Sequence, residues 1–368
     1  MSLSTVVRGS AMLLTLACAA GMEALAAAPA SPPSANPPPA NCAADGALQF
    51  ICGPKNAEDI VRLGTTRWLL ASGMDGGLVA TQSANGKLYL IDHREKSWRE
   101  AFPGAAPAFR HDRKLFGDCP GPVDTKNFSA HGISLREQLG GHYRLYVVGH
   151  GAREAIEVFD VDATAATPTI TWSGCVLLPA DVLANGVAIL ADWGFVVTKF
   201  LDRSLPQQQA LAQMRSSTPN GAVYEWHPGG TVKVIPGTEL SAPNGIEVSP
   251  DGNTIYVAAF GSGGLVRFKR GAGALQKDVI RLDITPDNVR WSATGKLLTA
   301  GSNQAAPGAA AATGWSVVEV DPATLATRRV VGGASSAGMQ AISVGTDVGD
   351  EIWLGTFNGD RVGYVKGK

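Results

Sequence analysis

The chain has 368 residues, of which 17% are charged, and its formal net charge is −1. Nucleic-acid-binding proteins normally carry a basic excess or a basic stripe, and this balance of charges argues against that class. Glycine accounts for 44 residues. No long amphipathic helix stands out, which argues against a helical bundle or a doubly wound α/β enzyme.

The N-terminal segment has the features of an export signal. Arg8 precedes an uncharged apolar run, and Ala24-Leu25-Ala26 supplies small residues at the spacing of a cleavage site. We therefore predict a signal peptide over 1–26 and a Pro-rich, unfolded tether over 27–41, with the protein exported to the periplasm or secreted. One alternative is a lipoprotein processed at Cys18, and another is a membrane anchor. Glu23, however, ends the run short of the roughly 20 residues that a spanning helix needs, so no stable span is expected.

Four cysteines follow the predicted signal and tether. They are Cys42, Cys52, Cys119 and Cys175. An even number in an exported chain is compatible with two disulfides, for which three pairings exist. No pair has C-x-x-C spacing, so we expect a structural role rather than a metal site.

Beyond Glu58, short β-type runs alternate with turns rich in Gly, Asn, Asp and Pro. This pattern predicts antiparallel hairpins in series. The clearest turn, Pro250–Asn253, joins Gly245–Ser249 to Thr254–Ala259. One segment, 201–216, has a helical pattern and resembles an insertion between strands. Other predicted strands are Arg67–Ser72, Lys87–Asp92, Tyr143–Val148, Ile156–Asp160, Gly194–Phe200, Ala222–Trp226, Gly264–Lys269, Trp315–Val320, Glu351–Thr356 and Arg361–Val365.

The strands are grouped with a coarse period. Polar residues open successive groups at intervals of mostly about 40–60 residues, which is typical of propeller blades of four strands each. The openings are Glu58, His131, Asn185, Asn244, Asp287 and Gln340. Six openings predict an all-β, six-bladed β-propeller over 42–368. The first strand of each blade would line the central channel, so the residues at these openings would converge there.

The openings are rich in hard oxygen donors, the ligands that calcium takes in 6–8 coordination. The donors are Glu58, Asp59, Asn185, Asn244, Asp287 and Asn288. Zinc is disfavoured because no His/Cys cluster has ligand spacing. Either Asn-Gly pair, at 185–186 or 244–245, would on its own be explained by a tight turn. Their recurrence at the same point of successive repeats favours a calcium site in the channel.

Several motifs carry a family resemblance. Ala130–Ser134 contains His131 and is followed nineteen residues later by His150, and Pro243–Gly252 and Pro286–Val289 come after them in the chain. In this order the motifs resemble the paraoxonase/arylesterase family. They are similar, more distantly, to the gluconolactonase and senescence-marker proteins, which share the six-bladed propeller.

The resemblance implies a calcium-dependent hydrolase of lactones and/or aryl esters, with a small-molecule lactone or ester as its partner. The implied calcium ligands are Glu58, Asn185, Asn244, Asp287 and Asn288. The implied dyad is His131 as general base for water, with His150 orienting it or relaying protons. Calcium would polarise the carbonyl oxygen of the substrate. For His150, at the end of an apolar strand, a purely structural role is the alternative.

The chain also departs from this family. A second, structural calcium would use Asp59 and the Ile133 carbonyl, but Gly186 stands where the family has an acid, so this second ion is left open. No cysteine follows Cys175, so the disulfide that joins the two ends of the family's propeller has no counterpart. The stretch 93–127 is longer than the family pattern, and we expect it to reshape the mouth of the channel.

Two other functions compete with hydrolysis. One is an exported propeller that binds a ligand or a protein without catalysis, since a fold alone does not determine function. The other is a strictosidine-synthase-like propeller, against which the three Asn donors argue. The nucleophile-elbow pattern G-x-S-x-G is absent, which disfavours a covalent serine mechanism. The particular lactone or ester and the oligomeric state are not readable from the sequence.

Overall fold

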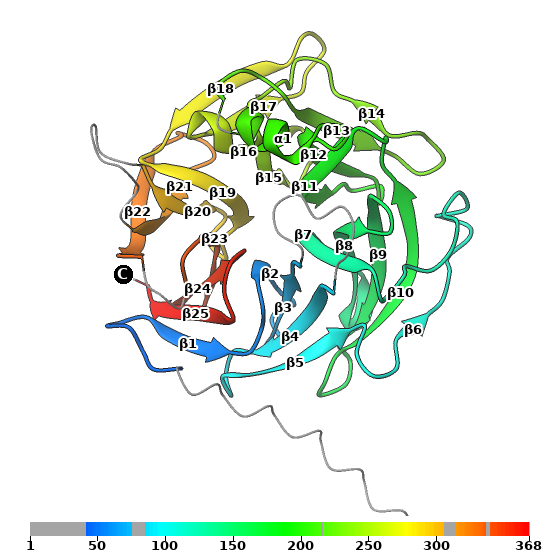
Figure 1. Cartoon of the computed structure of the whole chain (residues 1–368), viewed down its shortest axis with the longest axis vertical. Coiled ribbons are helices and arrows are strands. Elements are labelled where there is room, and N and C mark those ends of the chain that lie inside the picture. Colours follow the sequence, from blue (N-terminus) through cyan, green and yellow to red (C-terminus); the bar gives the residue numbers. More distant parts are fainter. Residues whose placement is uncertain (1–41, 76–84, 215, 305–313, 336–338, 368) are drawn as a thin grey trace, which may run out of the picture. The chain divides into compact units, whose positions relative to one another are not determined.

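The computed structural model describes residues 42–75, 85–214, 216–304, 314–335 and 339–367. The predicted signal peptide (1–26) and tether (27–41) lie outside them. From Cys42 onward the strands form six sheets around a central axis, which confirms the predicted all-β, six-bladed propeller (Figure 1). Within the described residues, no helix has the length and apolar character needed to cross a bilayer.

The six sheets are the blades of the propeller, and the strands of each lie side by side from the axis outward. In this order the first sheet contains β2 (Ala57–Arg62), β3 (Trp68–Gly73), β4 (Lys87–Asp92) and β5 (Ser97–Phe102). The second contains β7 (Phe128–Glu137), β8 (His142–Gly151), β9 (Ala155–Asp162), β10 (Thr169–Leu177) and β6 (Ala108–Phe109). The third contains β11 (Val182–Ile189), β12 (Phe195–Asp202), β13 (Ala222–Trp226) and β14 (Lys233–Val234).

The remaining sheets follow the same order. The fourth contains β15 (Pro243–Val248), β16 (Thr254–Ala259), β17 (Gly264–Lys269) and β18 (Gln276–Arg281). The fifth contains β19 (Ile284–Trp291), β20 (Leu297–Asn303), β21 (Trp315–Val320) and β22 (Thr327–Gly333). The sixth contains β23 (Ile342–Val348), β24 (Glu351–Thr356), β25 (Arg361–Lys366) and β1 (Gln49–Cys52).

The inner strands form a closed ring. β2, β7, β11, β15, β19 and β23 lie nearest the axis (Figure 1), each contacts the next, and β23 contacts β2. The ends of the propeller are joined by the antiparallel pairing of β1 with β25, in which Gln49 is opposite Tyr364 and Cys52 is opposite Arg361. A hydrogen-bonded ladder therefore closes the ring where the sequence lacks the family's disulfide.

The four cysteines form two disulfides, Cys42–Cys52 and Cys119–Cys175. The stretch 93–127, for which a role at the channel mouth was expected, contains Cys119. Its strand β6 pairs in parallel with β10, so the second sheet gains a fifth strand at the periphery (Figure 1). The disulfide from Cys119 to Cys175 links the stretch covalently to β10.

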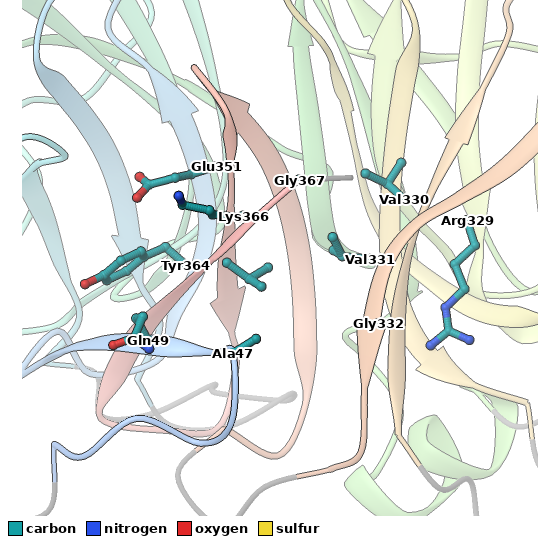
Figure 2. Close-up of a pocket in the computed structure, with 11 residues that line it drawn as sticks. Ala47, Gln49, Arg329, Val330, Val331, Gly332, Glu351, Tyr364, Lys366 and Gly367 are labelled. Atoms are coloured by element: carbon teal, nitrogen blue, oxygen red, sulfur yellow. The ribbon is translucent and has the colours of Figure 1, made fainter.

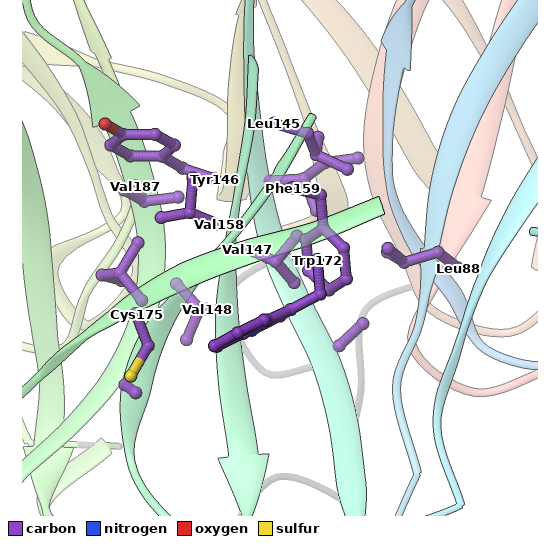
Figure 3. Close-up of a cluster of buried hydrophobic side chains, with 14 of the residues drawn as sticks. Leu88, Leu145, Tyr146, Val147, Val148, Val158, Phe159, Trp172, Cys175 and Val187 are labelled. Carbon is purple, nitrogen blue, oxygen red and sulfur yellow. The ribbon is translucent and has the colours of Figure 1, made fainter. Parts of the chain in front are cut away.

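The hydrophobic core lies between neighbouring sheets. Figure 3 shows its largest cluster, in which Leu88 of the first sheet and Val187 of the third pack with side chains of the second, including Tyr146 and Phe159. Trp172 is fully buried in this cluster, and its indole nitrogen donates to the buried Glu157 carboxylate at 2.8 Å. Burying each such side chain contributes about 1.5–3 kcal/mol, so packing between sheets holds the inner strands in place.

Many strand positions were predictable. The predicted bounds of β4, β13, β16, β17, β21 and β24 agree with the structure. The turn at Pro250–Asn253 is confirmed, and Gly252 has a φ of 73° there. Within 201–216 the helix α1 spans Gln207–Met214, between β12 and β13, and it buries Ala210 and Met214.

Candidate functional site

Each inner strand has a β-bulge or similar irregularity, a shift in register, in its pairing with the next strand of the same sheet. The shifts lie between Ala57 and Asp59, Ala130 and Ile133, Ala184 and Val187, Pro243 and Ile246, Pro286 and Val289, and Ile342 and Val344. The residues inside them are Glu58, His131-Gly132, Asn185-Gly186, Asn244-Gly245, Asp287-Asn288 and Ser343. Such irregularities change the direction of side chains and are common next to active sites. The sixth member is Ser343, not the predicted Gln340, which is exposed and precedes β23.

The glycines of these shifts are not turn residues, because Gly186 and Gly245 lie within β11 and β15. They allow neighbouring inner strands to approach closely. A Cβ on Gly132 would lie 2.1 Å from the Asn185 carbonyl oxygen, and one on Gly245 would lie 2.5 Å from the Asn288 Cα. The tight-turn explanation of the Asn-Gly pairs is therefore wrong, and the glycines set the width of the ring.

The predicted ligand residues contact one another through their amide nitrogens. Asn288 Nδ2 donates to Glu58 Oε1 at 2.6 Å, and Asn185 Nδ2 lies 3.3 Å from His131 Nε2. The Asn244 side chain is hydrogen-bonded to Asp287. The structure thus brings all five predicted ligands together with His131, and each asparagine uses its amide group within the set.

The oxygens of the same residues are left without partners. The buried side-chain oxygens that lack a hydrogen bond in the described structure include Glu58 Oε2, Asn185 Oδ1, Asn244 Oδ1 and Asn288 Oδ1. These residues are at most 3% exposed. A buried polar atom without a partner costs about 1–3 kcal/mol, so four on adjoining side chains call for a ligand.

The donor set fits calcium better than a transition metal. Within the described ranges, no group of three or more His, Cys, Asp or Glu is placed to hold a metal ion. The set consists instead of two carboxylates and three amide oxygens, which are ligands of hard cations such as calcium. Burial raises the pKa of both Glu58 and Asp287, and the nearby Asp59 raises both further. A cation bound among these carboxyls would favour their ionised forms.

The two histidines form a hydrogen-bonded relay that a third residue extends. His131 Nδ1 lies 2.9 Å from His150 Nε2, and His150 Nδ1 lies 2.9 Å from Glu154 Oε2. The Glu154 carboxylate accepts a hydrogen bond from His150 Nδ1–H, which leaves His150 Nε2 to accept one from His131 Nδ1–H. His131 Nε2 then carries a lone pair.

That nitrogen faces the ligand set. His131 Nε2 is 3.9 Å from Glu58 Oε2, and the side chain is 4% exposed. Burial, and after it the adjacent His150, lowers the pKa of His131 well below its ordinary value. The imidazole is therefore neutral near pH 7 and can accept a proton.

Glu154 was not predicted from the sequence. It is buried immediately before β9, and its Oε1 accepts from the Ala184 amide at 2.8 Å. It therefore also positions the residue before Asn185. The available signal was an acid directly preceding the strand pattern Ala155–Val161, in which apolar and acidic residues are mixed. His150, for which a purely structural role was the alternative, is held between His131 and Glu154.

Ser343 and Arg290 were also missed. Ser343 Oγ donates to the Glu58 carbonyl at 2.5 Å and so joins the sixth inner strand to the first. Arg290 contacts both Asp59 and the Ile133 carbonyl, the residues of the suggested second calcium site.

A separate cavity lies outside the candidate site and has none of its residues in its lining. It measures about 920 Å³ and lies at the outer strands, between Val331 of β22 and Tyr364 and Lys366 of β25 (Figure 2). We therefore place the site by its unpartnered oxygens and its histidine relay rather than by cavity size.

Comparisons with known proteins establish the fold. No family model matches the chain, and no curated protein sequence matches it. A solved gluconolactonase from Xanthomonas campestris is 16% identical with a TM-score of 0.51, over 87% of this chain and 89% of that one. A luciferin-regenerating enzyme is 11% identical with a TM-score of 0.52, over 87% and 97%. At these identities the chain shares with both proteins the propeller fold.

Proposed function

We propose that this protein is a calcium-dependent hydrolase of lactones and/or aryl esters. The observation that carries the proposal is the group of four unpartnered buried oxygens beside His131 Nε2, on Glu58, Asn185, Asn244 and Asn288. With the Asp287 carboxyl, these residues would hold the ion. A bound calcium ion would polarise a carbonyl oxygen and stabilise the negative charge that develops on it.

The protein's own contribution is proton transfer. His131 is placed to accept a proton from water at Nε2, because its Nδ1 is engaged by His150. The positive charge that this creates is stabilised through His150 by the Glu154 carboxylate. Glu58, 3.9 Å from Nε2, favours the charged imidazole as well. A relay of this kind contributes about 10²–10⁴-fold to rate.

The choice of substrate class rests on two supports. The motifs around His131, Asn244 and Asp287 resemble those of lactone and aryl ester hydrolases, and one solved protein with this fold is a gluconolactonase. A lactone and an aryl ester both present a carbonyl that the same site could polarise, so both belong in the first test.

A propeller that binds a ligand without catalysis is the second candidate. Such a protein would have use for the calcium ligands, but not for a buried relay that leaves a basic nitrogen facing them. The relay His131–His150–Glu154 therefore favours hydrolysis.

The test is hydrolysis of an aliphatic lactone, gluconolactone and phenyl acetate by protein from residue 42 onward. We expect activity that is lost on chelation and returns with calcium. His131→Gln should reduce it about 10²–10⁴-fold, whereas His142→Gln, which changes an exposed histidine on β8, should not. A folded, calcium-loaded protein inactive on all three would instead favour the binding propeller.

We also propose that the protein is exported, to the periplasm or the medium. Its two disulfides support this, since such bonds persist in oxidising compartments.

A further inference from the structure

The place suggested for a second calcium ion is filled by a side chain of the protein. Arg290 Nε donates to Asp59 Oδ1 at 3.0 Å, and its Nη2 donates to Asp59 Oδ2 as well as to the Ile133 carbonyl, the latter at 2.7 Å. Its Nη1 donates to Glu247 Oε1 at 3.0 Å. The guanidinium thus contacts the oxygens that a cation would take.

Asp59 has no oxygen left over. Besides Arg290, its Oδ1 accepts from the Ile60 amide at 2.9 Å and its Oδ2 accepts from the Ile133 amide at 2.8 Å. The calcium ligands of the proposed channel site differ in this respect, because four of their oxygens lack any partner. The acids of the proposed channel site therefore still require a cation, whereas Asp59 and Glu247 are already paired with the cationic side chain of Arg290.

Because the Arg290–Asp59 ion pair is buried, the folded protein depends on both partners. Arg290 is 5% exposed and Asp59 is fully buried, and an isolated charge in such surroundings is costly unless it is paired and hydrogen-bonded. Arg290 lies on β19, Asp59 on β2, Ile133 on β7 and Glu247 on β15. One guanidinium therefore connects four of the six inner strands.

We propose that the Arg290 guanidinium replaces a second calcium ion, so that this propeller holds at most one calcium and carries its other central cation within its own chain. The residues do not fit a second metal while Arg290 is present, because both Asp59 oxygens and the Ile133 carbonyl are engaged and Gly186 supplies no acid. This holds whether or not the channel site binds calcium.

The proposal has a specific consequence. Removing the guanidinium exposes the Asp59 and Glu247 carboxylates and the Ile133 carbonyl, which are oxygen ligands of the kind that calcium takes, with water completing the coordination. Arg290→Ala should therefore create a calcium site. Arg267→Ala is the matched control, because Arg267 is also buried and paired, with Asp278, but lies on β17 away from the axis.

The experiment is calcium stoichiometry at pH 8, by equilibrium dialysis and atomic emission on the chain from residue 42. We expect at most one calcium per wild-type chain and one more in Arg290→Ala. Neither Arg267→Ala nor the double variant Arg290→Ala/Asp59→Asn should gain an ion. Two ions in the wild type, or no gain in a folded Arg290→Ala, would overturn the proposal.

The outcomes remain separable from those of the proposed function. A wild type without calcium, together with a gain in Arg290→Ala, would support this inference and contradict the calcium-dependent mechanism. If Arg290→Ala folds only with calcium present, measured by circular dichroism, the ion has taken over from the guanidinium. If Arg290→Ala folds neither with nor without calcium, the wild-type stoichiometry tests the proposal. At most one calcium per chain supports it, and two contradict it.

Discussion

Glu154 Oε2 lies 2.9 Å from His150 Nδ1, and this contact determines which nitrogen of His131 can act as a base. We predict that Glu154→Gln lowers kcat about 10–100-fold with little change in KM. A glutamine can present its NH₂ group to His150 Nδ1, which would reverse both tautomers and place a proton on His131 Nε2. Glu154→Asp should restore part of the activity.

The pH profile separates this role from a merely structural one. Glu154→Gln should change the pH dependence of kcat. Glu157→Gln, which removes a buried carboxylate bound to Trp172, should lower stability and leave the profile unchanged. Equal pH profiles for wild type and Glu154→Gln would contradict the relay.

The fold and the convergence of the candidate ligand residues could be predicted from the sequence, for a physical reason. Strand runs and turns are local patterns, and a repeat places equivalent residues such as Asn185 and Asn244 at the same level without knowledge of any contact. Glu154 and Arg290 have no such pattern. Their roles depend on partners from other strands, Ala184 for Glu154 and Asp59 for Arg290, and those pairings exist only once the ring closes.

The sixth repeat and the glycines show the same limit. Ser343 is a small neutral residue where the other shifts carry candidate ligands or His131, so the polar pattern of the sequence favoured Gln340 instead. The Asn-Gly pairs favoured a turn locally, and only the distance between neighbouring inner strands shows why Gly186 and Gly245 are required.

Substitution of the ring glycines should destabilise the protein in the order of their clearances. A Cβ would lie 2.1 Å from the nearest backbone atom at Gly132, 2.5 Å at Gly245 and 3.0 Å at Gly186. We expect losses of about 3 kcal/mol or more for Gly132→Ala and about 1 kcal/mol for Gly186→Ala, with Gly245→Ala between them. The measurement is urea unfolding. Gly271→Ala is the control, since nothing lies within 4 Å of its Cβ position, and losses no larger than this control would contradict the tight ring.

Glu247 should make stability fall as pH rises. Burial raises its pKa from 4.5 to about 7, although Arg290 lowers it, and Asp59 raises it further. Between these values the folded protein keeps a proton that the unfolded chain releases, so the free energy of unfolding decreases with pH. Glu247→Gln removes this titration and keeps an oxygen for Arg290 Nη1.

The test is the difference in free energy of unfolding between Glu247→Gln and wild type, both saturated with calcium. From pH 4.5 to 7 it should shift in favour of the variant by at most about 3 kcal/mol. Glu239→Gln, which changes an exposed acid, should show no such trend. A difference that is constant with pH would mean that folding does not raise the pKa of Glu247.

Calcium should stabilise the folded protein, because the unpartnered oxygens of the ligand set occur together only in the native ring. At a calcium concentration of 100 times Kd, the gain is about 2.7 kcal/mol, which is measurable as a rise in Tm over the chelated protein. Asp287→Asn removes one of the two ligand charges and should weaken binding about 100-fold. Asp283→Asn, four residues earlier and exposed, should bind as the wild type does. If the Tm of the wild type is the same in chelator and in millimolar calcium, the proposed calcium site is contradicted.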